Sequence, residues 1–360
     1  MISKRRLTLL LCGGYLKIPN CIIFGSDGLD ADVTKNLQRL FVGFGYRVTK
    51  SIGQIPENFT EVLVIARSNS MDKYALIKSK VSALIIYDYA AESIDNFEYL
   101  SHLDKKIKKV IFISTCEDRI TALRNIHKKN RPDIVYHHAF LPVFPKLWIE
   151  KRVRERWPYP IHVGNFKELD DIDKNDPYLL FLKFIRREKV LVGGQRWHGY
   201  LPSSQRLGGL KLNTVSSVYA SHSFAVGIMY PYQRSCTYSG RFWQAPLNGC
   251  VLLSETTVYG KKIPGIYEVD FGKTVKELNE EIDFDSKTLM LESRIYWNAI
   301  TEDHIHFLSK KLPTFKLKGY LQIFKFTCIH LLSKARNMLL IRETLRKISD
   351  YHLTNTLNSF

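Results

Sequence analysis

Several features are missing from this 360-residue sequence, and their absence narrows the choice of protein class. No stretch reaches the ~18 uninterrupted apolar residues of a membrane-spanning helix. The six cysteines are scattered, without a Cys-x-x-Cys pair or histidines at metal-ligand spacing, so we expect neither a disulfide framework nor a metal centre. Repeats and low-complexity tracts are also absent. A hydrophobic content of 45% excludes a disordered or collagen-like chain.

Acidic residues are scarce relative to basic ones. Lys and Arg total 53 against 35 Asp and Glu, which leaves a net charge of +18 and indicates an anionic partner. About half of this surplus comes from segment 310–347, which interleaves basic residues with aromatic and aliphatic ones. We therefore expect a basic amphipathic helical tail over 310–360. The tail contacts an anionic membrane surface or packs across both domains, and the sequence is compatible with either.

The rest of the chain alternates short apolar runs with amphipathic ones, which is typical of parallel sheets covered by helices on both faces. A proline-bearing linker over 141–160 separates a first alternation in 1–140 from a second in 161–309. The expected strands are 21–24, 46–49, 61–66, 83–87, 110–114, 133–136, 161–163, 189–192, 224–229, 250–254 and 266–271. The expected helices include 32–44, 71–80, 173–187, 211–220, 240–247, 275–282 and 286–309. The fold class is therefore α/β, with two Rossmann-like doubly wound domains facing a central cleft.

The most informative stretch lies at 236–255. Ser239 is a suitable cap for a helix whose first turn carries Arg241, and Gly249 ends that helix before a buried strand. A helix N-terminus favours phosphate, and an arginine beside it adds a bidentate positive charge. The helix spans about two turns, so Gln244 lies near the same ligand.

This stretch resembles the donor-binding motif of GT-B glycosyltransferases, most closely the spore-maturation-protein-like branch of the group 1 transferases. The family pattern is Arg-x-Phe-Glu-Ala-x-Ala-Cys-Gly before an apolar strand. This chain has Arg241-Phe-Trp-Gln244-Ala-Pro-Leu-Asn-Gly249, followed by Cys-Val-Leu-Leu-Ser-Glu255. The resemblance is close over about twenty residues, loose over 160–285 and only architectural before that. It implies a nucleotide-sugar donor at these residues. Gln244 replaces the glutamate that usually binds the donor's ribose hydroxyls, so the nucleotide is left open.

Two further groups fit the implied donor site. Gly193 and Gly194 end an apolar strand as the family's phosphate-side glycine loop does, because glycine admits a ligand close to the backbone. Arg196 follows within reach of the donor's phosphate groups. Arg234 lies just before the motif helix and is expected to neutralise the same phosphate charge. The alternative for Gly193 and Gly194 is a plain strand-ending turn.

A transferase also needs a base for the acceptor hydroxyl, or a group that stabilises an oxocarbenium ion. Loops of the first domain supply this group in the GT-B fold. Asp27 is our first choice and Asp30 the second, although Asp30 is also a good helix cap. His137 and His138 follow another strand and come third, since one histidine of such a pair is more often a polar contact than a base. With arginines carrying the phosphate charge, we expect no metal, and no cofactor beyond the nucleotide-sugar substrate.

These features predict a glycosyltransferase that moves a sugar from a nucleotide-sugar donor to a hydroxyl of a glycan or lipid-linked glycan. The resemblance places it in bacterial capsule or lipopolysaccharide assembly. We expect a cytoplasmic chain, which the basic segment 310–347 can hold at the inner face of the cell membrane. One alternative is a nucleic-acid-binding protein with salt-dependent affinity, although no known binding module is recognisable. The other alternative is a sugar-nucleotide epimerase on the same fold.

Overall fold

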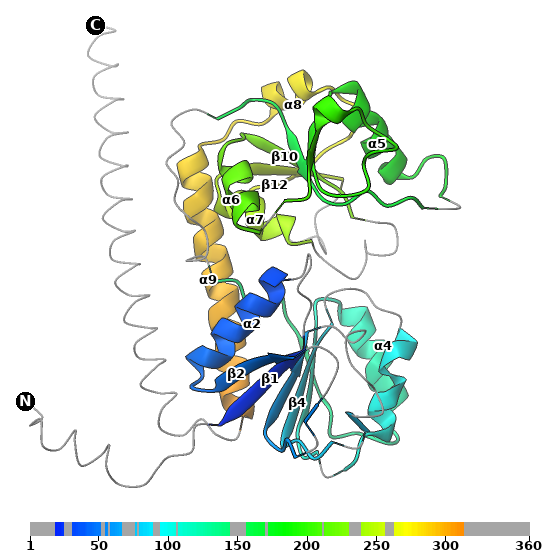
Figure 1. Ribbon diagram of the computed structural model, residues 1–360, viewed down its shortest axis with the longest axis vertical. Helices are drawn as coiled ribbons and strands as arrows, with labels where there is room; N and C mark the ends of the chain where they lie inside the picture. The colour runs from blue at the N-terminus through cyan, green and yellow to red at the C-terminus, as the bar shows by residue number, and fades with distance from the viewer. Residues whose placement is uncertain are drawn as a thin grey trace, which may run out of the picture.

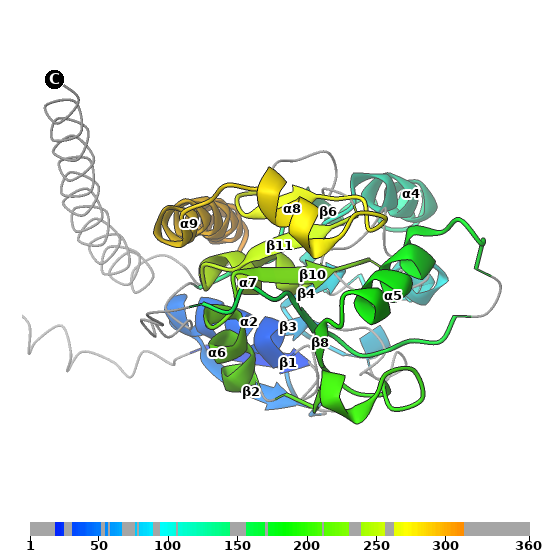
Figure 2. The ribbon, with the colours of Figure 1, turned by 90° about the horizontal axis from the view of Figure 1, so that it is seen from above.

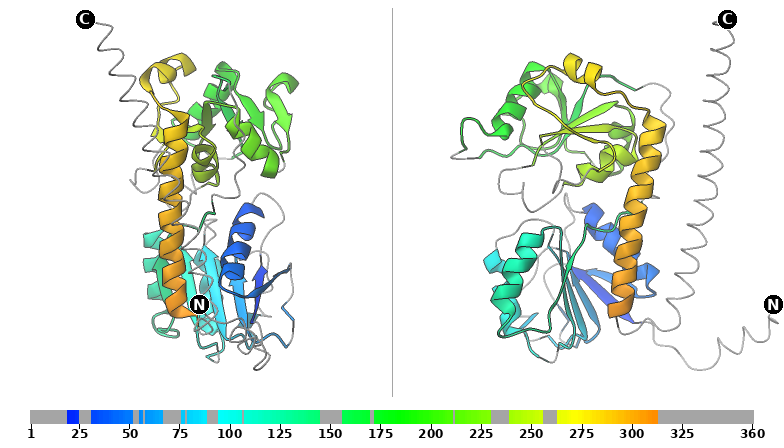
Figure 3. Two further views of the ribbon diagram at one scale, coloured as in Figure 1. Left: turned by 90° about the vertical axis from the view of Figure 1, so that its left-hand side faces the viewer. Right: turned by 180° about the vertical axis from the view of Figure 1, so that it is seen from behind.

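The computed structural model describes residues 19–24, 31–51, 55–56, 58–66, 76–77, 79–88, 94–105, 107–144, 156–169, 172–210, 212–229, 239–255 and 263–312. Two α/β units follow one another along the chain, and the long helix α9 (Ser286–Lys311) lies beside both of them (Figure 1, Figure 3). Most of the expected helix 71–80 and nearly all of the basic tail lie outside the described residues. Among the described residues, no helix is long and apolar enough to cross a membrane.

The first unit is built on a parallel sheet of six strands in the order β2-β1-β3-β4-β5-β6. The strands are β1 (Asn20–Phe24), β2 (Arg47–Ser51), β3 (Val62–Ile65), β4 (Ala83–Asp88), β5 (Val110–Ser114) and β6 (Val135–His138). Every residue of β3, β4 and β5 is buried, because helices cover both faces, and this explains their continuous apolar runs. The covering helices are α2 (Ala31–Gly43) on one face, and η2 (Ile94–His102) and α4 (Glu117–His127) on the other.

The second unit repeats this architecture with the strand order β12-β11-β10-β7-β8-β9. The strands are β7 (Ile161–Val163), β8 (Leu191–Gly193), β9 (Arg206–Gly208), β10 (Phe224–Gly227), β11 (Val251–Ser254) and β12 (Ile266–Glu268). The helices are α5 (Pro177–Arg187), η4 (Ser203–Gln205), α6 (Leu212–Ala220), α7 (Arg241–Leu247) and α8 (Val275–Glu281). Figure 2 shows α6 and α8 on opposite sides of β10 and β11, so this sheet is also covered on both faces.

The strands expected from the sequence are all present, within three residues at each end. The helix expected at 173–187 begins later, at Pro177. Asp176 caps it, because its Oδ1 accepts a hydrogen bond from Tyr178 N at 2.7 Å and proline suits the first turn. The short strand β9 was not expected, since Leu207 and Gly208 are exposed and three residues give no hydrophobic pattern.

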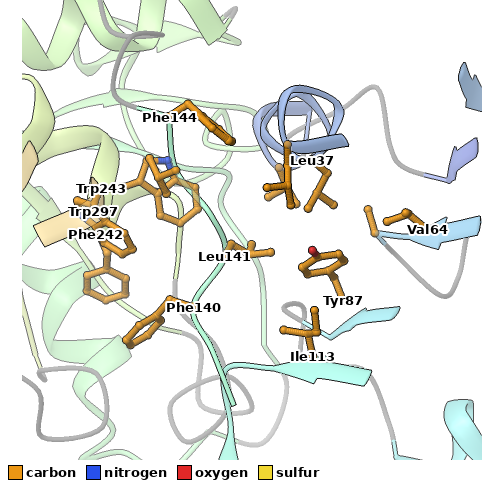
Figure 4. Close-up of a cluster of buried hydrophobic side chains, with 14 of the residues drawn as sticks. Leu37, Val64, Tyr87, Ile113, Phe140, Leu141, Phe144, Phe242, Trp243 and Trp297 are labelled. Carbon is orange, nitrogen blue, oxygen red and sulfur yellow. The ribbon is translucent and has the colours of Figure 1, made fainter. Parts of the chain in front are cut away.

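A continuous hydrophobic core joins the two units, as Figure 4 shows. It contains Leu37 of α2 and Tyr87 of β4 together with Trp243 of α7 and Trp297 of α9. Segment 140–144 fills the space between them, so the first residues of the expected linker are buried. The chain crosses from one unit to the other through this core.

Helix α9 contacts both units through buried side chains. Trp297 packs against Trp243 of α7, with ring centroids 5.9 Å apart. Two turns further along, a hydrogen bond of 2.7 Å joins His304 Nε2 to the hydroxyl of Tyr87 in β4. Thr301, between these contacts, accepts a hydrogen bond from the backbone N–H of segment 140–144. The helix therefore sets the position of α7 relative to the first sheet.

Candidate functional site

Two loops at the carboxyl ends of β7 and β8 are hydrogen-bonded to each other. Gly164 N donates to Gly193 O at 2.8 Å, and Gln195 N donates to Asn165 Oδ1 at 2.8 Å. Glycine is required at Gly194, where φ is +155° and an added Cβ would lie 2.0 Å from the carbonyl oxygen of Gly164. The Gly193-Gly194 turn therefore holds two loops of the second unit against each other.

Arg196 closes this turn in an unusual backbone conformation. Its φ is +68°, a region that costs a residue other than glycine about 1–3 kcal/mol and that is common at functional sites. Its side chain is exposed, whereas the next residue, Trp197, is buried and donates from Nε1 to Gly164 O at 2.8 Å. The turn thus presents a positive charge at the carboxyl edge of the second sheet.

Arg241, the first residue of α7, meets the loop that contains Gly164. Its Nε donates to Ser239 Oγ at 3.0 Å, and its Nη2 donates to Ile228 O at 3.0 Å. Ser239 Oγ also accepts from the backbone N–H of Arg241 at 3.4 Å, and Gly240 between them has helical angles of φ −51° and ψ −25°. Ser239 therefore bonds to the first turn of the helix, as expected of a cap, and positions the arginine side chain as well. The remaining nitrogen, Nη1, would lie 3.2 Å from a Cβ added to Gly164.

A cavity of about 10 Å³ lies beside this arginine and has room for one water-sized group. Its walls are His162, Asn165, Tyr178, Phe181, Trp197, Ile228 and Arg241. His162 was not predicted as a site residue; it is 2% exposed and donates from Nδ1 to Val226 O at 3.0 Å. Burial and the charge of Arg241 lower the pKa of His162 to about 3, so its ring is neutral at pH 7.

Two other residues of the motif lie near Arg241. Glu255 accepts from Met229 N at 2.9 Å and from Ser254 Oγ at 3.0 Å, so it fixes the chain next to the carbonyl that Arg241 binds. Gln244 follows Arg241 by about one turn of α7 and is 8% exposed. The structure therefore brings Arg241 and Glu255 together at residues 228–229, and Arg241 also meets the Gly164 loop, to which the Gly193-Gly194 turn is hydrogen-bonded.

Gly249 lies at the opposite end of α7, where it ends the helix as expected. Its φ is +71°, and an added Cβ would lie 2.7 Å from Nη2 of Arg156. Arg156 donates to the carbonyl oxygens of Tyr219, His222 and Asn248 at 3.4, 3.0 and 2.8 Å. This arginine of the expected linker, which was not predicted from the sequence, joins the ends of α6 and α7. The position of Gly249 is that of a turn residue, away from the group around Arg241.

The candidate bases of the first unit are only partly described. Three expected site residues lie outside the described residues: Asp27, Asp30 and Arg234. His137 stacks on Phe307 of α9, with ring centroids 3.7 Å apart, and burial lowers the pKa of this histidine. His138 Nε2 is 3.1 Å from Thr115 O. The structure thus places His137 in the contact with α9, where its ring packs against another ring.

Asp88, a buried acid that was not predicted as a site residue, ends β4. Its carboxylate accepts from Arg119 Nε at 2.7 Å, from Arg119 Nη2 at 3.2 Å and from Ser114 Oγ at 3.1 Å. Burial raises the pKa of Asp88, and the Arg119 guanidinium opposes that shift. Because parallel strands end at one edge of a sheet, Asp88 shares its edge with Phe24, the last residue of β1. Its signal in the sequence was an acid that directly ends a buried apolar run.

The carboxyl edge of the first sheet and the carboxyl edge of the second sheet lie on the sides of the two units that face each other. In Figure 1, the beginning of α2, which follows β1, and α7, which follows β10, lie on the sides of the two units that face each other. The positive charge of Arg241, at the start of α7, therefore lies on the side of the second unit that faces the first, where it can attract a negatively charged ligand. Among the described residues, no three His, Cys, Asp or Glu side chains are grouped to hold a metal ion.

Comparison with known proteins gives a match of structure only. No protein-family model matches the sequence, and a search of the curated proteins found no match. The T4 phage BGT solved with its UDP-glucose substrate superposes with a TM-score of 0.51 at 14% identity, covering 81% of this chain and 98% of that chain. Anabaena Alr3699/HepE with UDP-glucose gives a TM-score of 0.51 at 10% identity, covering 81% and 100%.

A third structure is described as the DNA modifying enzyme β-glucosyltransferase. It superposes with a TM-score of 0.51 at 12% identity over 79% of this chain and 96% of that chain. At such low identity the likeness establishes the fold alone. It nevertheless extends over both units, so the two parallel-sheet domains expected from the sequence are confirmed, and the chain has the GT-B fold of these glycosyltransferases.

Proposed function

We propose that this protein is a glycosyltransferase that uses a UDP-sugar donor. The observation that carries the proposal is the grouping of Arg241, Glu255 and the Gly193-Gly194 turn at the carboxyl edge of the second sheet, within a GT-B fold. Ligands of open α/β sheets bind at that edge. The T4 phage BGT and Anabaena HepE structures of the same fold contain UDP-glucose, which supports a uridine nucleotide. The Arg241-to-Glu255 motif supports placement in the group 1, spore-maturation-protein-like branch.

Arginine side chains would neutralise the donor's diphosphate. Arg196 lies on the loop after β8, Arg241 begins α7, and Arg234 belongs to the segment between β10 and α7. The exposed Arg196 can present two parallel N–H groups to a phosphate, whereas Arg241, whose Nε and Nη2 already donate to Ser239 and Ile228, adds a positive charge that persists at any working pH. We therefore propose that transfer proceeds without a metal ion, while Gln244 contacts the nucleotide from α7.

The acceptor would lie against the first unit, where a carboxylate removes the proton of its hydroxyl. Asp27 remains the first candidate for this base, and Asp30 the second. Asp88 lies at the same edge, and its raised pKa suits proton transfer, but its bidentate contact with Arg119 must loosen before it accepts a proton. Substituting each aspartate by asparagine, with donor affinity unchanged and turnover lost, identifies the base.

The proposed setting is bacterial capsule or lipopolysaccharide assembly. There the acceptor is a glycan or lipid-linked glycan, and the basic segment 310–347 binds the anionic inner face of the membrane. DNA is the second candidate acceptor. It is favoured by the net charge of +18 and by the DNA-modifying enzyme among the structures of similar fold. Transfer to DNA would be strongly inhibited by salt, because each phosphate contact releases counterions.

A thermal-shift panel tests the proposed function. Uridine, guanosine, adenosine and cytidine diphosphates are compared with and without Mg²⁺ at two salt concentrations. A bound ligand at a hundredfold excess over its Kd stabilises the folded state by about 2.7 kcal/mol, so the donor nucleotide should stand out. We expect UDP to raise the melting temperature equally with and without Mg²⁺. A flat panel, combined with salt-sensitive binding of DNA, would refute the transferase and favour a nucleic-acid-binding protein.

A further inference from the structure

We propose that His162 and Arg241 form a subsite for one hydroxyl group of the donor, so that His162 is a specificity-determining residue. The inference rests on the proposed function and deepens it. The residues that line the cavity beside Arg241 determine which chemical group the cavity can accept.

The hydrogen bond of His162 determines which ring nitrogen is available to a ligand. The carbonyl oxygen of Val226 can only accept, so the bond of 3.0 Å to it places the proton on Nδ1. Nε2 is therefore an unprotonated acceptor, and within the described part of the chain it receives no hydrogen bond. Burial and the nearby guanidinium hold the pKa of His162 at about 3, so Nε2 stays an acceptor at neutral pH.

A hydrogen-bond donor of Arg241, its Nη1, lies close to the same point as the acceptor His162 Nε2. A Cβ built on Gly164 would lie 2.8 Å from His162 Nε2 and 3.2 Å from Arg241 Nη1. The other nitrogens of the guanidinium group, Nε and Nη2, already donate to Ser239 and Ile228, so Nη1 is the one directed here. The glycine at this position keeps the space between the two side chains open.

A hydroxyl group satisfies both side chains at once. Its O–H donates to His162 Nε2, and its oxygen accepts from Arg241 Nη1. The diphosphate of a nucleotide sugar carries no proton at neutral pH, so a phosphate oxygen would face the lone pair of Nε2 without a hydrogen bond. The cavity of about 10 Å³ also suits a group of the size of one water, and a phosphoryl group is larger.

The ring of His162 is held by apolar neighbours that do not compete for the hydroxyl. Phe181 and Trp197 contact it edge to face, with ring centroids 5.1 and 5.4 Å away. The charged and titratable groups on the cavity walls besides His162 are Arg241 and Tyr178, and the hydroxyl of Tyr178 donates to Lys167 O at 2.7 Å. The nitrogen therefore has a fixed direction, which selection of a single hydroxyl requires.

The test measures the affinity of the full chain for UDP-glucose and for analogues that each lack one hydroxyl of the ribose or the glucose. The wild type should bind one analogue at least about tenfold more weakly, which is the usual effect of one lost hydrogen bond in a buried site. The variant His162→Phe keeps the ring packing and should bind this analogue and UDP-glucose equally. The matched control Tyr178→Phe changes another wall of the cavity by removing a hydroxyl that is bound to Lys167 O, so it should keep the wild-type preference.

Equal affinity of the wild type for all analogues overturns the inference, as does a preference that survives in His162→Phe. If that variant does not fold, a pH series on the wild type decides. The hydroxyl preference should stay constant between about pH 5 and pH 8, because the neutral ring does not titrate there. Tighter binding of UDP on acidification through this range would mean that a protonated His162 binds phosphate, which contradicts the inference. Failure of the wild type to bind UDP or UDP-glucose at all refutes the proposed function instead.

Discussion

Acid should weaken the contact between α9 and the first sheet, because a neutral histidine is buried there. His304 is 1% exposed, and its Nε2 is bound to the hydroxyl of Tyr87 at 2.7 Å. His137 lies beside it, with ring centroids 6.4 Å apart. Burial, assisted by His137, lowers the pKa of His304 to about 3.

The sign and size of the effect follow from proton linkage. The ordinary pKa of histidine is 6.5, so the unfolded chain binds this proton first as the pH falls. The stability contributed by His304 is complete above about pH 6.5 and is lost as the pH falls from there towards 3. Each pH unit within this window corresponds to about 1.4 kcal/mol, so going from pH 6.5 to pH 5 removes about 2 kcal/mol of unfolding free energy.

Urea unfolding at pH 7 and pH 5 measures this loss in the wild type and in His304→Gln, which cannot titrate. The variant should lose about 2 kcal/mol less than the wild type over this pH change. His306→Gln is the matched control, because it removes an exposed histidine of the same helix and should leave the acid sensitivity unchanged. An equal loss in the wild type and in His304→Gln would refute the reasoning.

Three further predictions concern stability. Arg156→Ala removes hydrogen bonds to three carbonyl oxygens at the ends of α6 and α7, so urea unfolding should show a loss of about 3 kcal/mol; a loss below 1 kcal/mol would contradict the role of Arg156. Trp297→Ala should cost about 3–5 kcal/mol and Trp297→Phe less, because Trp297 is fully buried between the units. Equal melting temperatures for these two variants would be inconsistent with packing at this position. Thr274→Ala should cost about 1 kcal/mol, since Thr274 and Glu277 form a reciprocal capping box at α8, whereas Thr274→Ser should be close to neutral in the same assay.

The central strands of the two sheets could be predicted because they are almost entirely apolar. Runs such as Val62–Ile65 and Val251–Ser254 are buried on both faces, which is the pattern typical of a parallel sheet between helix layers. The place of Arg241 at the start of a short helix also followed from the sequence, because Gly249 ends that helix and a buried strand follows. Local patterns were sufficient for these elements.

The remaining parts of the site depend on contacts between distant residues, which local patterns do not contain. His162 looks like any polar residue in a strand until Arg241, 79 positions later, is folded against Gly164. Arg156 stands in a proline-rich segment and binds carbonyls up to 92 positions away. The role of His137 depends on Phe307, which α9 brings back to the first unit. The roles of such side chains can be assigned only from the folded structure, because their partners are distant in the sequence.

The most direct test of the central claim is the affinity of UDP-glucose for the wild type, Arg241→Ala and Arg241→Lys, measured by titration calorimetry. Lys183→Ala, an exposed change on α5, is the control, and the urea midpoint of each variant reports whether it is folded. We predict that Arg241→Ala weakens binding by about tenfold to a hundredfold or more, the value of a charge-assisted hydrogen bond, and that Arg241→Lys restores only part of it. A folded Arg241→Ala variant that binds UDP-glucose as tightly as the wild type would contradict the assignment of this site.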